Sequence, residues 1–231
     1  MRVEYTSGRV PPSRAVIFDL DGTLVDTADD IASALNAALR ANGFRPLTSQ
    51  RVQKLVGNGA SVLVEEALRI QGVKSSPEQV KKIKEHYLNS YCAKPVVATK
   101  AFPFAAEVLA TLAARRFAIG ICTNKPEKLA HIILQRLGLD VYIEALVASD
   151  SGYGQKPNPR PLLACAWELE VPPTRCVYVG DHSVDVQTAR SAGIPIVAVG
   201  FGYSTVPVHD LGADCSIDCL SEFPDTLSNF Y

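Results

Sequence analysis

The sequence predicts an α/β fold in which a doubly wound, mostly parallel sheet carries an inserted bundle of helices. Three observations lead to this prediction: short apolar runs recur along the chain, amphipathic patterns separate most of them, and one long segment contains helical patterns alone. Apolar runs without polar alternation are typical of strands buried on both faces of a parallel sheet. With 231 residues, the chain is long enough to bury a substantial core.

The expected strands are the unbroken apolar runs. The first covers residues 15–18, and the later ones cover 117–122, 145–148, 176–179 and 196–199. Helical patterns of ordinary length lie between most of them, and strands that alternate with such helices form βαβ units with a parallel sheet. We therefore expect a Rossmann-like core.

Two of the connecting helices have clear limits. One begins at Pro126 and ends at Gly138, because proline is favoured in the first turn of a helix and glycine just after its end. The other spans about 159–170 and has an apolar stripe that includes Trp167. We expect this stripe, with Trp167, to face the core.

The alternation is interrupted after the first strand, which ends near Leu20, and no further strand is expected before residue 117. The intervening segment is helical in pattern. Its first helix has an apolar face formed by Ile31, Ala34, Leu35, Ala38 and Leu39. A later helix begins at Ser76 and Pro77, where Gln79 completes the pattern of a capping box.

Helices of this kind must bury their apolar faces against one another. We expect a helical cap domain at 27–96, set over the carboxyl edge of the sheet, where it can act as a lid. Residues 94–99 form the returning linker, and residues 1–26 and 97–231 form the core domain.

Composition and charge exclude several classes of protein. Hydrophobic residues make up 47% and charged residues 20%, with a net charge of −1, so neither nucleic acid nor an anionic membrane surface is an expected partner. No apolar stretch is long enough to span a bilayer, and residues 1–6 lack the apolar segment of a secretory signal. We expect a cytoplasmic protein, either a monomer or a homodimer, whose six cysteines stay reduced.

Acidic residues follow two of the expected strands. Asp19 and Asp21 come after the first, and Asp181 and Asp185 come after 176–179. The side chains of an extended Asp-x-Asp point the same way, and carboxylates on one face repel each other unless a cation lies between them. Because the carboxyl ends of parallel strands meet at one edge, the sequence predicts a Mg²⁺ site there. An EF-hand is the competing interpretation, but its glycine is misplaced and its closing glutamate is missing.

Residues suited to binding an anion follow two other strands. Thr123 and Asn124 precede the helix that begins at Pro126, and helix N-termini bind phosphate readily. Lys156 adds a positive charge on a loop that contains Pro157 and Pro159. A phosphate dianion would bridge a metal and this lysine.

These segments together resemble the motif series of the haloacid-dehalogenase superfamily. The segments are 18–26, 123–126, 156–159 and 179–185, and the resemblance covers essentially the whole chain. The inserted helices are similar to the cap found in the phosphatases of this superfamily. Residues 56–60 and 201–203 further resemble phosphoglycolate phosphatases.

The resemblance implies a role for each core residue. Asp19 would attack phosphorus and form an aspartyl-phosphate, and Asp21 would protonate the leaving group and then activate water. Asp19, the backbone carbonyl of Asp21 and Asp181 would hold Mg²⁺, with Asp185 bracing them. The residues that would hold the transferring phosphoryl oxygens are Thr123, Asn124 and Lys156.

The expected substrate is a small phosphorylated metabolite, with 2-phosphoglycolate the first to try. Asp21 favours phosphate chemistry, because the dehalogenase branch of the family lacks this second carboxylate. Three alternatives stay open: a phosphosugar phosphatase, a phosphosugar mutase that passes the phosphoryl group to sugar, and a phospho-ligand binding protein without turnover.

Several residues have two interpretations. Gly57, Asn58 and Gly59 either form a turn between two cap helices or bring backbone amides to an anionic substrate tail. Lys125 could touch the substrate, but it lies in the first turn of a helix, where a charge is usually solvated. Thr27 and Ser183 are expected to be helix caps.

Overall fold

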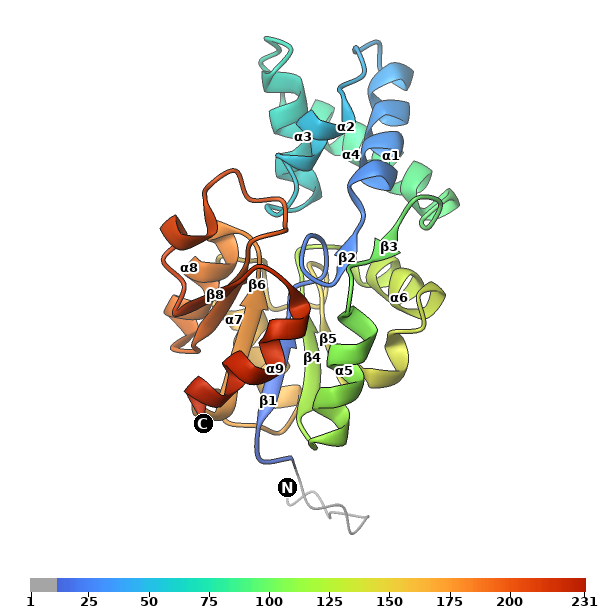
Figure 1. The fold of residues 1–231 in the computed structure, drawn as a ribbon. Coiled ribbons are helices and arrows are strands. Elements are labelled where there is room, and N and C mark those ends of the chain that lie inside the picture. The colour runs from blue at the N-terminus through green and yellow to red at the C-terminus, as the bar shows by residue number, and fades with distance from the viewer. Residues whose placement is uncertain (1–11) are drawn as a thin grey trace, which may run out of the picture.

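Six parallel strands form the central sheet, in the order β5-β4-β1-β6-β7-β8 (Figure 1). The computed structural model describes residues 12–231. The strands are β1 (Ala15–Phe18), β2 (Val25–Asp26), β3 (Lys100–Ala101), β4 (Ala118–Cys122), β5 (Ala145–Val147), β6 (Cys176–Gly180), β7 (Ile196–Val199) and β8 (Cys215–Ile217). The α-helices are α1 (Ala28–Ala41), α2 (Ser49–Gln53), α3 (Ala60–Arg69), α4 (Pro77–Ala93), α5 (Ala105–Ala114), α6 (Glu127–Arg136), α7 (Arg160–Glu168), α8 (Ser183–Ala192) and α9 (Phe223–Thr226).

The chain order reverses beside β1. This strand pairs with β4 on one side and β6 on the other, so that Ala15 lies opposite both Ala118 and Cys176. The strands β4 and β5 extend the sheet in one direction, and the chain then returns to β6 and continues outward through β7 and β8. Open α/β sheets bind their ligands at the carboxyl ends of the strands, at such a switch point.

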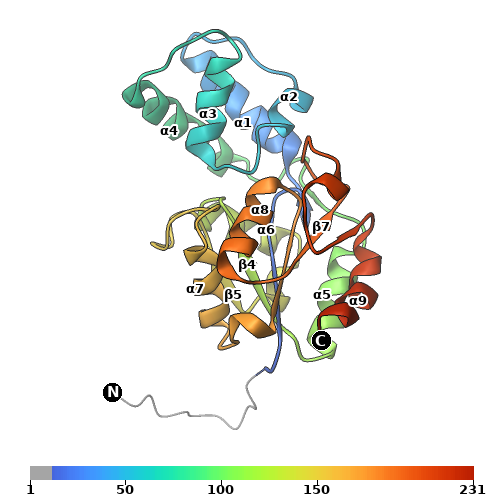
Figure 2. The same cartoon turned by 90° about the vertical axis from the view of Figure 1, so that its left-hand side faces the viewer.

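Alternate residues of β1 separate the two faces of the sheet. Val16 and Phe18 belong to the apolar cluster that includes side chains of α5, α6 and α9. Ala15 and Ile17 belong to the cluster on the opposite face, with α7 and α8. This is the period of two expected for a strand, and all four side chains are fully buried. The predicted doubly wound parallel sheet is therefore confirmed (Figure 2).

The helices α1 to α4 gather above the carboxyl edge of the sheet (Figure 1). The helix α1 packs against α2 and α4, and α3 packs against α4. The expected apolar face of α1 is buried, with Leu35 and Leu39 fully inaccessible. Ser76 caps α4 as expected, because its hydroxyl accepts a hydrogen bond from the amide of Gln79 at 3.3 Å.

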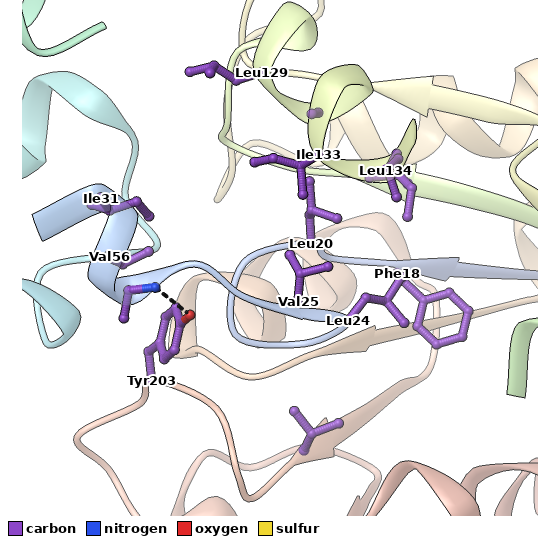
Figure 3. Close-up of a cluster of buried hydrophobic side chains, with 14 of the residues drawn as sticks. Phe18, Leu20, Leu24, Val25, Ile31, Val56, Leu129, Ile133, Leu134 and Tyr203 are labelled. Atoms are coloured by element: carbon purple, nitrogen blue, oxygen red, sulfur yellow. Dashed lines mark hydrogen bonds between the residues drawn. The ribbon is translucent and has the colours of Figure 1, made fainter. Parts of the chain in front are cut away.

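Two very short strands join these helices to the sheet. The strand β2 pairs antiparallel with β3, so that Val25 lies opposite Ala101. The expectation of no strand between Leu20 and residue 117 is therefore wrong. Strands of two residues show no apolar run or alternation, which is why the sequence pattern does not predict them. Figure 3 shows Val25 and Leu20 packed beneath Ile133 and Leu134 of α6.

Two further expectations about the core need correction. The edge strand β8 is absent from the expected set, because only Ile217 of its three residues is buried and its centre is an exposed serine. Trp167 does not face the core but is 75% exposed. The buried face of α7 is formed by residues at helical spacing, Leu162 and Cys165, followed by Leu169, and Trp167 lies off this stripe.

The described residues contain no helix long and apolar enough to cross a membrane. All six cysteines are free, and Cys122, Cys165 and Cys176 are buried, where cysteine packs as a small apolar side chain. The interpretation of residues 1–6 as lacking a secretory signal lies outside the described residues.

Candidate active site

Two strand ends and the start of one helix bring acidic side chains together beneath the inserted helices. Asp19 follows β1 directly, Asp181 follows β6, and Asp185 lies in the first turn of α8. Carboxylate oxygens of these three residues lie within 4.8 Å of one another. All three side chains are almost fully buried. Their convergence follows from the parallel pairing of β1 with β6, which aligns the carboxyl ends of the two strands.

Lys156 is the cation of this cluster. Its Nζ atom lies 2.6 Å from Asp185 Oδ1 and 2.8 Å from Asp19 Oδ1. The contact with Asp19 has the distance of an ion pair but not the direction of a hydrogen bond. Asp19 Oδ1 is consequently the one buried side-chain oxygen or nitrogen, among the described residues, that has no hydrogen bond. This oxygen is thus held by the ion pair with Lys156 alone.

Burial and mutual repulsion act on the carboxylates. Burial raises the pKa of Asp19 to about 6, although the neighbouring Lys156 opposes this rise. Burial, with the charges of Asp185 and Asp19, raises the pKa of Asp181 well above its usual range. Burial alone would lower the pKa of Lys156, but the adjacent carboxylates outweigh it and raise it. One lysine therefore leaves the negative charge of the cluster incompletely balanced.

Two glycines make room for the carboxylate of Asp181. A Cβ atom at Gly22 would lie 2.5 Å from Asp181 Oδ2, and one at Gly202 would lie 2.2 Å from Asp181 Cβ. Thr23 Oγ1 donates a hydrogen bond to Asp181 Oδ1 at 3.1 Å, and the Tyr203 amide donates to Oδ2 at 2.7 Å. The site thus fixes Asp181 by hydrogen bonds, whereas Asp19 Oδ1 has only the ion pair with Lys156. Clustered buried carboxylates of this kind suit a divalent cation that prefers oxygen ligands.

Both oxygens of Asp185 have partners within the protein. Oδ1 accepts from Lys156 and from the hydroxyl of Tyr178 at 2.9 Å, and Oδ2 accepts from the amide of His182 at 3.0 Å. His182, rather than Ser183, is the N-cap of α8, so the expectation for Ser183 is wrong. The reason is that Ser183 already lies inside the first turn. Asp185 thus orients Lys156 and the start of α8 together.

Asp21 lies apart from the three clustered carboxylates. Its Oδ1 accepts from Lys125 Nζ at 2.9 Å and from Thr27 Oγ1 at 2.6 Å, and its Oδ2 accepts from Lys125 at 3.0 Å. Lys125 is buried, with 3% of its side chain exposed, so the expectation of a solvated charge is wrong. The side chain is covered by Tyr91 of α4, whose hydroxyl lies 3.0 Å from Nζ. Thr27 occupies the N-cap position of α1 but makes no side-chain cap hydrogen bond.

The residues that follow β4 divide between two tasks. The Thr123 hydroxyl accepts from the amide of Lys125 at 3.2 Å, which leaves its own proton for an incoming anion. The Asn124 side chain instead joins three loops: Nδ2 donates to the carbonyls of Gly57 and Lys156, and Oδ1 accepts from the Lys156 amide. Its carboxamide is thus satisfied within the protein, which leaves the backbone amide as the group that Asn124 would offer to a phosphoryl oxygen.

A small cavity of about 40 Å³ separates the helical segment from the sheet. Its lining residues are Asp19, Asp21, Ile31, Val56, Gly57, Gly59, Ala60, Leu63, Tyr87, Thr123, Asn124, Lys125 and Pro126. Gly57 and Gly59 thus reach the cavity, whereas Asn58, Lys156 and Asp181 are not part of its lining. Gly59 has a φ of +86° and is the N-cap of α3, a conformation that favours glycine.

The geometry agrees with comparisons to known proteins. The sequence model of the haloacid dehalogenase-like hydrolases matches residues 16–199. The chain belongs to this family. A phosphoglycolate phosphatase from Rhodospirillum rubrum is 37% identical over 218 residues, which is 93% of this chain and 90% of that protein. An N-acetylmuramic acid 6-phosphate phosphatase from Pseudomonas aeruginosa is 34% identical over 217 residues, 93% of this chain and 94% of that protein.

Solved structures support the same assignment. The crystal structure of a predicted phosphoglycolate phosphatase from Haemophilus somnus has a TM-score of 0.85 and 26% identity, and covers 95% of this chain and 100% of that one. Like its relatives, this haloacid dehalogenase-like protein is a phosphatase that acts on small phosphorylated substrates.

Three residues around the site are absent from the sequence-based set of candidates. Lys125 is adjacent to Asn124, but only docking of α4 reveals its burial. Tyr178 is a polar residue within the apolar run of β6, and a hydroxyl group in such a run indicates a buried hydrogen bond. Tyr203 lies in a loop after β7, within the segment 201–203 that resembles phosphoglycolate phosphatases, but the resemblance assigns it no role.

Proposed function

We propose that this phosphatase hydrolyses 2-phosphoglycolate with the help of Mg²⁺, through an aspartyl-phosphate formed on Asp19. The observation that carries the proposal is the position of Asp19, which lines the cavity beside Lys156 and the other clustered carboxylates. A carboxylate in the wall of the cavity can act as a nucleophile toward a phosphate bound there.

The residues fit a divalent cation. Asp19 and Asp181 would hold Mg²⁺ together with the backbone carbonyl of Asp21. Asp185 would not bind the ion directly but would orient Lys156 beside it. When bound, Mg²⁺ would supply positive charge that offsets repulsion between the carboxylate nucleophile and the phosphate dianion. The incomplete charge balance of the metal-free cluster, with the raised pKa values of Asp19 and Asp181, supports this assignment.

In the first step, a carboxylate oxygen of Asp19 attacks phosphorus. A bond forms between this oxygen and phosphorus while the bond from phosphorus to the ester oxygen breaks. Asp21 gives its proton to the departing ester oxygen, which leaves as an alcohol. Asp21 lines the cavity beside Asp19, and Lys125 and Thr27 fix the direction of its carboxylate.

In the second step, water attacks the phosphorus of the aspartyl-phosphate. Asp21, now ionised, takes a proton from this water, and the bond between phosphorus and Asp19 breaks to release phosphate. The two steps return Asp19 and Asp21 to their starting forms. One acidic side chain therefore serves both halves of the reaction.

Other residues would hold the transferring group. The Thr123 hydroxyl and the Asn124 amide are placed to donate to phosphoryl oxygens, and Lys156 would add positive charge from beneath. The segment 27–96 would form the cap domain that closes over residues 1–26 and 97–231 and excludes water. The backbone amides that follow Gly57 and Gly59 would face the leaving group from the start of α3.

The cavity supports a small substrate over a sugar phosphate. Sugars need several polar partners for their hydroxyls, but the side that the helices contribute is lined mainly by small or apolar residues, and Tyr87 is the one residue there with a polar side-chain group. The same lining argues against a mutase that must hold a second sugar. A two-carbon leaving group such as glycolate needs far fewer polar contacts.

A substrate panel with the purified protein tests the proposal. With Mg²⁺ present, kcat/KM for 2-phosphoglycolate should exceed that for glucose 6-phosphate and N-acetylmuramic acid 6-phosphate, and glucose 1-phosphate should yield phosphate rather than glucose 6-phosphate. The Asp19→Asn variant should lose phosphate release by at least about a thousandfold, while Asp225→Asn, which changes an exposed carboxylate, stays normal. Normal turnover by Asp19→Asn would refute the nucleophile.

A further inference from the structure

Lys125 contributes a buried positive charge to the cavity. Among the described residues that line this cavity, it is the only one with a cationic side chain. Its ammonium group is held in place from two directions, because it contacts both oxygens of Asp21 and the hydroxyl of Tyr91. Nζ also lies 4.6 Å from the centre of the Tyr91 ring, a distance at which the ring attracts a cation.

The position of Lys125 relates it to the ester oxygen of a substrate. Asp21 must be within hydrogen-bond reach of this oxygen to protonate it. Lys125 Nζ is 2.9 Å and 3.0 Å from the two carboxylate oxygens of Asp21, so it lies one hydrogen-bond length beyond Asp21 as seen from the ester oxygen. If a substrate carboxylate is joined to the ester oxygen through a single carbon, that carboxylate would lie close enough to Lys125 to pair with it.

The helical side of the cavity offers Lys125 no anionic partner. The residues that line it there carry no charge. Asp21 is therefore the only carboxylate among the described residues that contacts the ammonium group, and a buried positive charge needs anionic partners. A carboxylate on the substrate would supply a second one.

We infer that Lys125 selects phosphomonoesters that carry a carboxylate next to the ester oxygen, the class of 2-phosphoglycolate and 2-phospholactate. The inference rests on the proposed hydrolytic function but concerns the substrate charge rather than one metabolite. Lys125 is thus a specificity-determining residue that reads the leaving group. Phosphate itself is bound elsewhere, beside Asp19 and Thr123.

Paired substrates and paired variants test this role. The carboxylated substrates are 2-phosphoglycolate and 2-phospholactate, and 2-hydroxyethyl phosphate replaces the carboxylate of the first with an uncharged alcohol of similar size. The variants are Lys125→Met, which removes the charge, and Lys125→Arg, which keeps it. Lys128→Met is the matched control, because Lys128 is exposed on the same helix, α6.

We expect Lys125→Met to raise KM for both carboxylated substrates by roughly tenfold to a hundredfold, the range for losing a charged hydrogen bond. The loss for 2-hydroxyethyl phosphate should be at least tenfold smaller, Lys125→Arg should keep part of the preference, and Lys128→Met should match the parent. Equal losses for charged and uncharged substrates, in a variant that retains its melting transition, would overturn the inference and leave Lys125 only a support for Asp21.

A second variant guards against misfolding of Lys125→Met. Tyr91→Phe keeps the ring and the charge of Lys125 but removes the 3.0 Å contact between its hydroxyl and Nζ. It should raise KM several-fold for the carboxylated substrates alone, and an equal change for 2-hydroxyethyl phosphate would contradict the inference.

The proposed function can fail separately. If 2-phosphoglycolate is a poor substrate but 2-phospholactate shows the charge preference, the substrate assignment is wrong and the role of Lys125 stands. If the parent protein hydrolyses 2-phosphoglycolate well but shows no preference for charge, the role of Lys125 is wrong and the substrate assignment stands.

Discussion

The hydroxyl oxygen of Tyr203 lies 2.6 Å from the backbone nitrogen of Thr27, at the start of the first inserted helix. The same hydroxyl accepts from the amide of Ala28 at 3.1 Å (Figure 3) and donates to Asp26 Oδ1 at 2.7 Å. The backbone amide of Tyr203 meanwhile donates to Asp181. One residue thus connects the carboxylate cluster to the point where the chain enters the cap helices.

Replacing Tyr203 with phenylalanine should weaken this connection. Two helix N-terminal amides lose their acceptor, so we expect the free energy of unfolding to fall by about 1–3 kcal/mol. Mg²⁺ affinity should change little, because the Tyr203 amide that binds Asp181 remains. Urea denaturation with and without Mg²⁺ measures both quantities. Tyr142→Phe, at a half-buried tyrosine, is the control, and an equal effect there would contradict the assigned role.

Asp30 should stabilise the return linker in a pH-dependent way. Its carboxylate accepts from the amides of Val97, Ala98 and Thr99 and from the Thr99 hydroxyl. Burial acts to raise the pKa of Asp30, but these hydrogen bonds together lower it below its ordinary value of 3.8. The stabilisation is therefore present above this value and is lost as the pH falls through the lowered pKa.

The Asp30→Asn variant removes this dependence. Its free energy of unfolding at neutral pH should be lower by about 1–3 kcal/mol, and the gap from the parent should narrow below pH 3.8. Urea denaturation over an acid pH series measures the gap. Glu65→Gln is the control, because it makes a carboxylate-to-amide change at an exposed position on α3. It should leave the free energy of unfolding nearly unchanged. A constant gap at every pH would refute the assigned role of Asp30.

Metal binding should become more stabilising as the pH rises. In the metal-free protein the pKa of Asp19 is raised from 3.8 to about 6, so its contribution to stability is fully present below 3.8 and is lost as the pH rises through 6. A divalent cation needs the ionised carboxylate and stabilises the folded state that binds it. The increase in Tm on replacing EDTA with Mg²⁺ should be larger at about pH 7.5 than at about pH 5. Asp19→Asn should show little such increase, and a pH-independent increase in the parent would contradict the prediction.

A methyl group at Gly202 should damage the site without a large effect on the fold. The added Cβ would lie 2.2 Å from Asp181 Cβ, so one of the two residues must move. We expect Mg²⁺ affinity or kcat/KM to fall roughly tenfold to a hundredfold. Gly138→Ala is the contrasting control: it has open space but a φ of +67°, so it should cost stability by about 1–2 kcal/mol and leave Mg²⁺ affinity intact. Retained affinity in Gly202→Ala would show that the loop adapts.

The sheet and its acidic edge could be predicted because each depends on local pattern. Apolar runs specify buried parallel strands, and parallel pairing then determines that Asp19 and Asp181 lie at the same edge. The two-residue strands β2 and β3 carry no such pattern. Trp167 was misplaced for a related reason, since a helix of nine residues admits more than one apolar stripe.

The environments of the side chains were harder to predict than their positions. Lys125 is buried only because Tyr91, distant in sequence, covers it, and a first-turn lysine without that cover is solvated. The carboxamide of Asn124 joins the loops around Gly57 and Lys156, a contact between distant segments that the sequence does not indicate. Such contacts depend on how the inserted helices sit on the sheet, which no local pattern encodes.

The pairing of β2 with β3 places the entrance and exit of the inserted helices side by side. An insertion whose two ends are neighbours can be exchanged for another, or shortened to a tight turn, without changing the order of the sheet strands. The inserted helices are thereby a separable part of the polypeptide, which can change while the acid groups beneath are kept.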